Sequence, residues 1–140
     1  MNLRDTIKKI TRKHLEKNKG LILGQCLSVV GWVNGTVPDT FGIVELPMTD
    51  VAGAGFAVGA AVAGRRPILV IRFQDFLTLN MSPIVNFAAK RKDIWGRSVP
   101  LFVRALAQEG FGTGPTHSAK YHSLMCHFPG LRVWCPITPK

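Results

Sequence analysis

The chain has 140 residues, of which 46% are hydrophobic, and a formal net charge of +10 at pH 7. This length and apolar content exclude a disordered chain and allow a single domain with a substantial core. Because no apolar run reaches the roughly 18 residues that a bilayer-spanning helix needs, we expect no membrane span.

The positive charge raises the question of nucleic-acid binding. The basic residues gather in residues 4–19 and 90–92, and no aromatic side chains are interleaved with them. A surface for single-stranded nucleic acid uses aromatic rings on which bases stack. We therefore favour a solvated helix face with contacts to an acidic partner subunit over a nucleic-acid partner.

Cysteine usage and the N-terminus bear on the compartment. Cys26, Cys126 and Cys135 are odd in number and form no CxxC pair. The first 19 residues are charged and contain no apolar stretch of the kind that signal peptides have. Reduced thiols in a cytoplasmic protein are the simplest interpretation, with a disulfide as the alternative.

The first half of the chain predicts two helices and two strands. Residues 2–18 repeat apolar side chains at helical spacing between charges, which predicts an amphipathic helix. A short buried strand at 21–23 and, after a glycine-rich loop at 31–42, a second strand at 43–46 follow. A helix of glycine and alanine is expected over 51–63. Since each glycine costs a helix about 1 kcal/mol, these small residues imply that another surface presses on that helix.

The second half opens with a strand over residues 67–73. It is apolar throughout apart from Arg72, as in a parallel strand with helices on both sides. A helix over 82–92 is expected to have Ser82 as its cap and Pro83 at its first position. Beyond it we expect, in order, a strand over 100–106, a glycine-rich loop over 110–116, a helix over 118–126 and a strand over 131–135.

This alternation of strands and helices predicts an α/β domain whose mostly parallel sheet has helices on both faces. We divide the chain into a basic N-terminal helix (1–19) and an α/β domain (20–140). The sequence stops just after a predicted strand, where a doubly wound domain continues with a helix. The domain is therefore expected to be one piece of a larger assembly.

Several common site signatures are missing or weak. Gly110, Gly112 and Gly114 lack the spacing of a phosphate-binding loop. His117, His122 and His127 are five residues apart, a spacing that turns successive side chains by about 140° on a helix, so they share no face. We predict no metal site. No serine or cysteine lies in a recognised nucleophile motif.

Asp50 is the acid with the most informative position. It follows a strand and precedes the glycine–alanine helix, at the edge where open α/β sheets bind ligands. Two interpretations stay open. Asp50 is either a ligand-binding acid or the residue that caps the following helix.

Several blocks of this sequence resemble one protein family. Residues 46–67, LPMTDVAGAGFAVGAAVAGRRP, resemble the PISExGxAGxAxGAAxxGxRP segment of 2-oxo acid dehydrogenase beta subunits. Similar blocks follow in the same order and at the family's spacing: RFQDF at 72–76, IVNFAAK at 84–90, PLFVR at 100–104, HS at 117–118 and HFPGLRV at 127–133. The likeness covers nearly the whole chain after residue 20, and it extends more distantly to the middle domain of transketolases.

The resemblance implies a thiamine diphosphate-binding fold, and within it the pyrimidine domain. The family's carboxylate at the position of Asp50 hydrogen-bonds N1′ of the aminopyrimidine, which helps the 4′-nitrogen to take the proton from C2. Phe76 matches the aromatic residue that stacks on the pyrimidine. His117 matches an active-site histidine that contacts the substrate carboxylate or reaction intermediates. Gln25 stands where the family has a glutamate of an acidic network linking active sites.

The chain also departs from the family pattern. Asp50 replaces a glutamate, which shortens the acid by one methylene, about 1.5 Å of reach. Gln25 replaces an acid by an amide, and the connection from Gln25 to Asp50 is about six residues shorter than usual. Residues 1–140 contain no match to the beta subunit's C-terminal domain, which we expect to be missing, and none to the motif for Mg²⁺ and diphosphate, which the family places on the alpha chain.

The resemblance therefore implies a subunit of a split thiamine diphosphate enzyme, such as a 2-oxo acid dehydrogenase (an oxidoreductase). It would act on a 2-oxo acid or ketose by decarboxylation or by C–C bond cleavage or transfer. An alpha-type partner would supply the Mg²⁺ and diphosphate site, in a homo- or hetero-oligomer. The alternative is a catalytically inactive structural or regulatory paralogue, for which Gln25 and Asp50 would be marks of decay.

Overall fold

A computed structural model describes residues 1–29, 31–108, 110 and 112–139. It begins with helix α1 (Leu3–Lys17), as expected from the apolar spacing. Thr6, Thr11 and Leu15 form the buried side of α1, and its charged residues face outwards. No helix in the described part of the chain is long and apolar enough to cross a membrane.

The centre of the fold is a sheet of four parallel strands. They are β1 (Gly20–Gln25), β2 (Ile43–Leu46), β3 (Arg66–Ile71) and β4 (Phe102–Ala105), in the spatial order β2-β1-β3-β4. Two strands lie inside the sheet, and β1 pairs with both β2 and β3. The predicted parallel sheet is therefore confirmed, with β4 at one edge.

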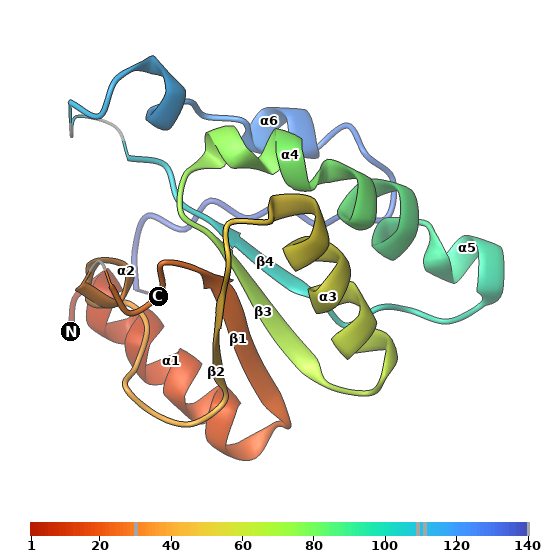
Figure 1. Ribbon diagram of the computed structural model, residues 1–140, viewed down its shortest axis with the longest axis horizontal. Helices are drawn as coiled ribbons and strands as arrows, with labels where there is room; N and C mark the ends of the chain where they lie inside the picture. The colour runs from red at the N-terminus through yellow and green to blue at the C-terminus, as the bar shows by residue number, and fades with distance from the viewer. Residues whose placement is uncertain (30, 109, 111, 140) are drawn as a thin grey trace.

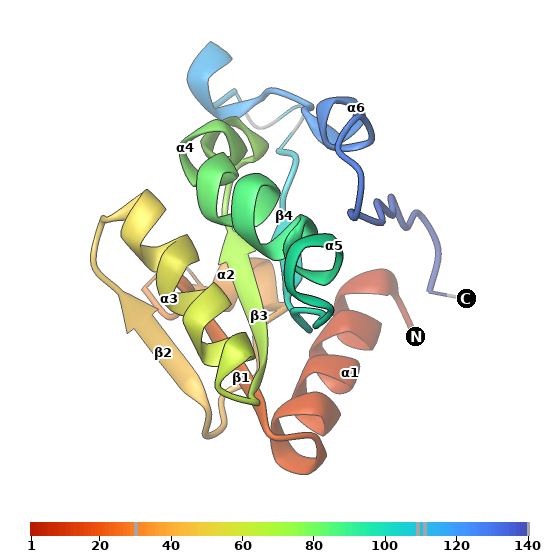
Figure 2. The same cartoon turned by 90° about the vertical axis from the view of Figure 1, so that its right-hand side faces the viewer.

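Helices cover both faces of this sheet, as the sequence predicts (Figures 1 and 2). On one face, α3 (Asp50–Val62) and α4 (Leu77–Met81) cover a core that includes Leu23 and Leu69. On the other face, Leu15 of α1 packs with Ile22 and Val70. Alternate residues of each strand thus point to opposite cores, as the period of a strand requires.

The segment 31–42 contains a short turn, α2 (Gly31–Gly35), that lies over the second core. All five of its residues have positive φ, including Trp32, Val33 and Asn34. Such left-handed backbone costs an ordinary L-residue roughly 1–2 kcal/mol, so burial has to offset it. Val33 is 3% exposed and provides that burial.

The predicted start of the helix at Ser82 is wrong. Ser82 has helical backbone angles (φ −59°, ψ −52°) and continues α4 into η2 (Ser82–Ala89), a π-helix, after which α5 (Arg91–Trp95) follows. Pro83 therefore lies inside a continuous helical segment. A proline has no N–H for the helical ladder, and the wider π turn accommodates that missing donor.

The predicted strand at 131–135 is also wrong, because the chain there pairs with no strand. Leu131 and Val133 pack on the core cluster that includes Leu69 and Ile71, whereas Trp134 is 78% exposed. This alternation of buried and exposed side chains has the same period as a strand, so the pattern alone misleads. The helix expected at 118–126 is shorter, with α6 spanning His122–Met125.

Candidate functional site

The four residues singled out in the sequence all lie at the carboxyl ends of the strands. Gln25 ends β1, and Asp50 begins α3 after β2. Phe76 ends η1 (Gln74–Phe76), the short turn that follows β3. His117 ends η3 (Pro115–His117), in the segment that follows β4. Parallel sheets bind their ligands at this edge.

The hydrogen bonds at the start of α3 bear on the interpretation of Asp50 as a helix cap. The N-cap residue is Thr49, and its side chain makes no capping hydrogen bond. Instead the amide oxygen of Gln25, in the orientation that satisfies both ends of the amide, accepts from the backbone N–H of Thr49 at 3.1 Å and of Asp50 at 3.3 Å. Gln25 therefore accepts from the first N–H of the helix, that of Asp50, whereas the N–H of Thr49 also donates to the carbonyl oxygen of Pro47 at 2.8 Å. The carboxylate of Asp50 makes no capping hydrogen bond among the described residues.

The carboxylate of Asp50 is held by Asn80, a residue that the sequence analysis did not single out. Oδ1 of Asp50 accepts from Nδ2 of Asn80 at 3.3 Å. The same Nδ2 donates to the carbonyl oxygen of Phe76 at 2.8 Å. Asn80 is only 3% exposed, so it links the start of α3 to the turn after β3 from inside the protein. A buried asparagine within an apolar helix is the signal that points to such a role.

Phe76 and His117 meet in a cluster of three rings with Phe73. The ring centroids of Phe76 and His117 are 5.4 Å apart, and those of Phe73 and His117 are 4.5 Å apart, both nearly perpendicular. Nδ1 of His117 is paired with Oγ1 of Thr116 at 2.9 Å. Hydrogen bonds and ring contacts thus connect Gln25, Asp50, Phe76 and His117 through Asn80 in one site.

Glu45 of β2 fixes the turn that follows Gln25. Its carboxylate accepts from the N–H groups of Leu27 at 2.8 Å and Ser28 at 3.1 Å. Burial on its own raises the pKa of Glu45, but these backbone hydrogen bonds and the Ser28 hydroxyl outweigh burial and hold the pKa below its ordinary value. The two acids near the site therefore differ in their contacts, since Glu45 binds the turn after β1 and Asp50 binds the side chain of Asn80.

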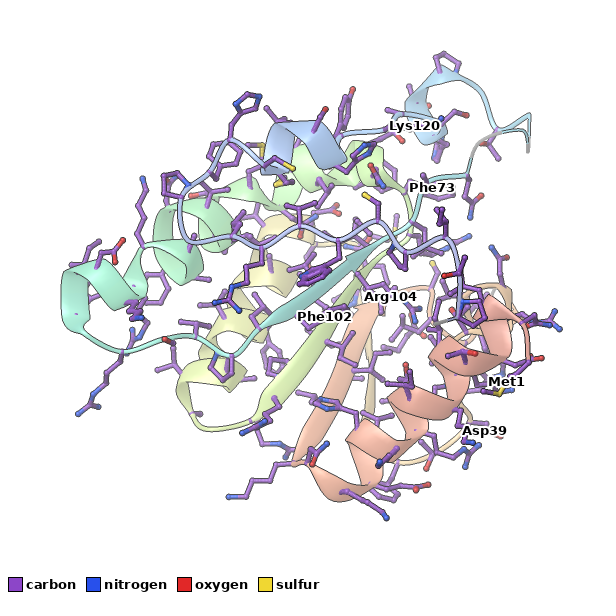
Figure 3. All side chains as sticks on the ribbon, turned by 180° about the vertical axis from the view of Figure 1, so that it is seen from behind. Met1, Asp39, Phe73, Phe102, Arg104 and Lys120 are labelled. Carbon is purple, nitrogen blue, oxygen red and sulfur yellow. The ribbon has the colours of Figure 1, made fainter. Side chains whose placement is uncertain are left out.

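Arg104 lies at the carboxyl end of β4 but belongs to the opposite face, paired in register with Val70 and nearer to α1 (Figure 3). Its Nη2 donates to Oγ1 of Thr36 at 3.0 Å, whereas Nε and Nη1 are buried without a hydrogen-bond partner among the described residues. Burial lowers the pKa of Arg104 to about 10. This cation points away from the His117 side of the sheet, so it is not part of the site.

Other features of the described residues lie apart from this site. A surface hollow of about 460 Å³, lined by Lys17, Lys19 and Arg65 among others, is at the opposite, amino end of the strands. Within the described residues, no group of three His, Cys, Asp or Glu side chains is placed to hold a metal ion. Cys26, Cys126 and Cys135 are present as free thiols.

Comparison with known proteins places this chain in a family. Residues 9–140 match the model of the transketolase pyrimidine-binding domain. That match covers most of the chain, and the chain belongs to this family. The family assignment confirms the fold class expected from the sequence.

The relatives are beta subunits. The beta subunit of acetoin:2,6-dichlorophenolindophenol oxidoreductase from Cupriavidus necator is 37% identical over 69% of this chain. The mitochondrial beta subunit of 2-oxoisovalerate dehydrogenase from Chaetomium thermophilum is 33% identical over 89% of it. The corresponding Bacillus subtilis subunit is 29% identical over 99%. The matched regions are 29%, 28% and 45% of these relatives, so this chain spans less than half of their length.

Proposed function

We propose that this chain supplies the aminopyrimidine side of a thiamine diphosphate site in an enzyme that acts on a 2-oxo acid or a ketose. The observation that carries the proposal is the state of Asp50. Gln25 accepts from N–H groups at the start of α3, so the carboxylate of Asp50 does not cap that helix. Asn80 binds this carboxylate at the carboxyl edge of the sheet, where parallel sheets bind ligands. Two of the relatives are named as beta subunits of 2-oxoisovalerate dehydrogenase, which supports a 2-oxo acid as the substrate.

Each residue of the site has a distinct task in this proposal. Asn80 donates to Oδ1 of Asp50, and Oδ2 has no hydrogen-bond partner among the described residues. Oδ2 would therefore accept a hydrogen bond from the protonated N1′ of the aminopyrimidine. Phe76 offers a flat apolar ring for the heterocycle. Nε2 of His117, since Nδ1 is paired with Thr116, would exchange a hydrogen bond or proton with the substrate. The bound cofactor supplies the carbon nucleophile that attacks the substrate carbonyl.

The fit of these residues to the cofactor rests on their chemistry. The carboxylate of Asp50 is half-buried and does not cap α3. Such a carboxylate can stabilise the protonated form of a ring nitrogen by a hydrogen bond. Asp50 is one methylene shorter than the family's glutamate. Asn80 anchors that shorter side chain from the far side, next to the Phe76 carbonyl that it also holds. We assign Mg²⁺ and the diphosphate to a partner subunit of alpha type.

The outer face of α3 supports the proposal that the chain works in an oligomer. A Cβ added at Gly55 or Gly59 would meet nothing within 4 Å, and Phe56 between them is 56% exposed. Val62 on the same side is 45% exposed. An apolar helix face with glycines allows a second helix to approach closely, which is the arrangement we propose for the subunit contact. We also propose a cytoplasmic location, which the free thiols support.

Calorimetry with thiamine diphosphate and Mg²⁺ tests whether this chain and an alpha-type subunit each bind one part of the cofactor. We expect weak binding to this chain alone, and affinity at least 100-fold higher once an alpha-type subunit is added, because each chain contributes half of the contacts. Tight, Mg²⁺-dependent binding to the chain alone would contradict the proposal.

Gly59→Leu separates assembly from folding in the same experiment. The added side chain meets open space within the chain, and leucine favours a helix over glycine by roughly 0.5–1 kcal/mol, so the isolated variant should fold normally. In an assembled interface the same side chain would clash. Light scattering should then find loss of the oligomer and loss of the partner-dependent gain in affinity. Normal assembly of Gly59→Leu would count against α3 as the contact.

A further inference from the structure

The segment that carries His117 has little regular structure of its own. Between the end of β4 at Ala105 and the start of α6 at His122, the described residues form only the short turn η3. Backbone ladders therefore do not fix the position of the His117 ring. Hydrogen bonds within the segment, such as those of Thr113 and Thr116 with His117, order the turn but do not attach it to the rest of the molecule. A side chain that acts on a substrate needs a fixed position, so other groups have to attach this turn to the fold.

Two side chains of η1, the turn that follows β3, provide this attachment. Oε1 of Gln74 accepts from the backbone N–H of Tyr121 at 2.7 Å and of His122 at 3.1 Å. Oδ2 of Asp75 accepts from the backbone N–H of Ala119 at 3.2 Å. These three bonds span 44 to 48 residues of sequence. Figure 3 shows the two regions next to one another, at the labelled Phe73 and Lys120.

The same short stretch of chain also seats the His117 ring. Phe73 and Phe76 flank Gln74 and Asp75 in sequence, and both aromatic rings contact His117 edge-on. Residues 73–76 thus fix His117 in two ways, since their outer members touch the ring and their inner members bind the backbone that follows it. Gln74 and Asp75 are half-buried, which shields these hydrogen bonds from competition with water.

We propose that Gln74 and Asp75 are positioning residues for His117. They bind the segment 119–122 to η1, and this fixes the position from which Nε2 of His117 reaches the substrate. This inference rests on the proposed function for the role of His117. The clamp, by which we mean the hydrogen bonds of Gln74 and Asp75 to the segment 119–122, does not depend on that function. The two oxygen acceptors matter through geometry, because neither Gln74 nor Asp75 needs to touch the substrate.

The test compares Gln74→Met with Gln74→Glu in the full chain. Methionine keeps the length of the side chain but removes the acceptor, whereas glutamate keeps an acceptor oxygen. We expect the amides of Tyr121 and His122 to exchange with deuterium about 10-fold faster in Gln74→Met and at the wild-type rate in Gln74→Glu. Unchanged exchange in Gln74→Met would overturn the clamp, whatever the activity of the protein.

Kinetics of the complex with its partner then test positioning. Gln74→Met should lower kcat about 10-fold with little change in the apparent affinity for thiamine diphosphate, and Gln74→Glu should restore it. In a His117→Ala background, Gln74→Met should cause no further loss, because the residue that it positions is gone. An equal further loss in that background would overturn the positioning role. A wild-type complex without any activity would instead refute the proposed function and leave the exchange result as the test of the clamp.

Discussion

Helices α1 and α3 begin in different ways, and the difference explains what Asp50 is free to do. The start of α1 is satisfied locally, since the side chain of Asn2 accepts from the N–H of Asp5 at 2.9 Å. At the start of α3 the acceptor is Gln25, a residue from another element. A helix that is capped from a distance can carry an acid at its first position without using that acid for its own stability.

The largest effect expected from this comparison is that of Asp50→Asn on activity. If Asp50 holds N1′, the amide keeps the shape but loses the negative partner, and turnover of the complex should fall by more than about 10²-fold. The urea midpoint of the chain should hardly change, because Asp50 does not cap α3. Steady-state kinetics and equilibrium unfolding measure the two quantities.

Asp50→Glu is the matched control, since it keeps the charge and has the family's longer side chain. We expect it to be tolerated or to improve turnover. Activity of Asp50→Asn within twofold of the wild type, with the fold intact, would contradict a role of Asp50 at N1′ and favour the interpretation in which Asp50 serves only the start of α3.

Gln25→Met tests the distant cap itself. Methionine offers no amide oxygen to the N–H groups of Thr49 and Asp50, so the free energy of unfolding should fall by about 1–3 kcal/mol. Gln25→Glu retains an acceptor and adds a negative charge near a helix N-terminus, which should match or exceed the wild-type stability. Urea unfolding of both variants gives the comparison, and equal midpoints for Gln25→Met and the wild type would show that Gln25 is not the cap.

Asn2→Ala gives the smallest effect and completes the contrast. Loss of a local N-cap costs about 1 kcal/mol of stability, and α1 lies on the face of the sheet away from α3, so turnover should stay as in the wild type. Asn2→Asp, which caps equally well, should leave both quantities unchanged. A fall in turnover for Asn2→Ala would mean that the two helix starts are not independent.

Features that depend on local contacts could be predicted from the sequence, whereas those that depend on distant contacts could not. The parallel sheet and α3 could be predicted, because apolar periodicity and small residues are local signals. The positions of Gln25, Asp50, Phe76 and His117 at one edge also follow from their places after strands. Asn80 and Gln74 could not be found, because their partners lie 30 to 48 residues away in the chain.

The two wrong predictions in the fold share one cause. Pro83 is typical of a first helical position, but here a π turn absorbs it within a longer helix. Leu131 and Val133 alternate as in a strand but pack on the core without a ladder partner. In both places packing against distant elements overrides the preference that the local pattern indicates.

The strand order has a consequence for synthesis of the protein. Ile22 and Leu23 of β1 are fully buried in the folded chain, yet β3, which pairs with β1, ends 46 residues after it. At about 5–20 residues per second, a ribosome needs roughly 2 to 9 s to make that length of chain. During this interval β1 can pair only with β2, and its apolar side chains lack the neighbouring β3, so the nascent segment should be a substrate for chaperones.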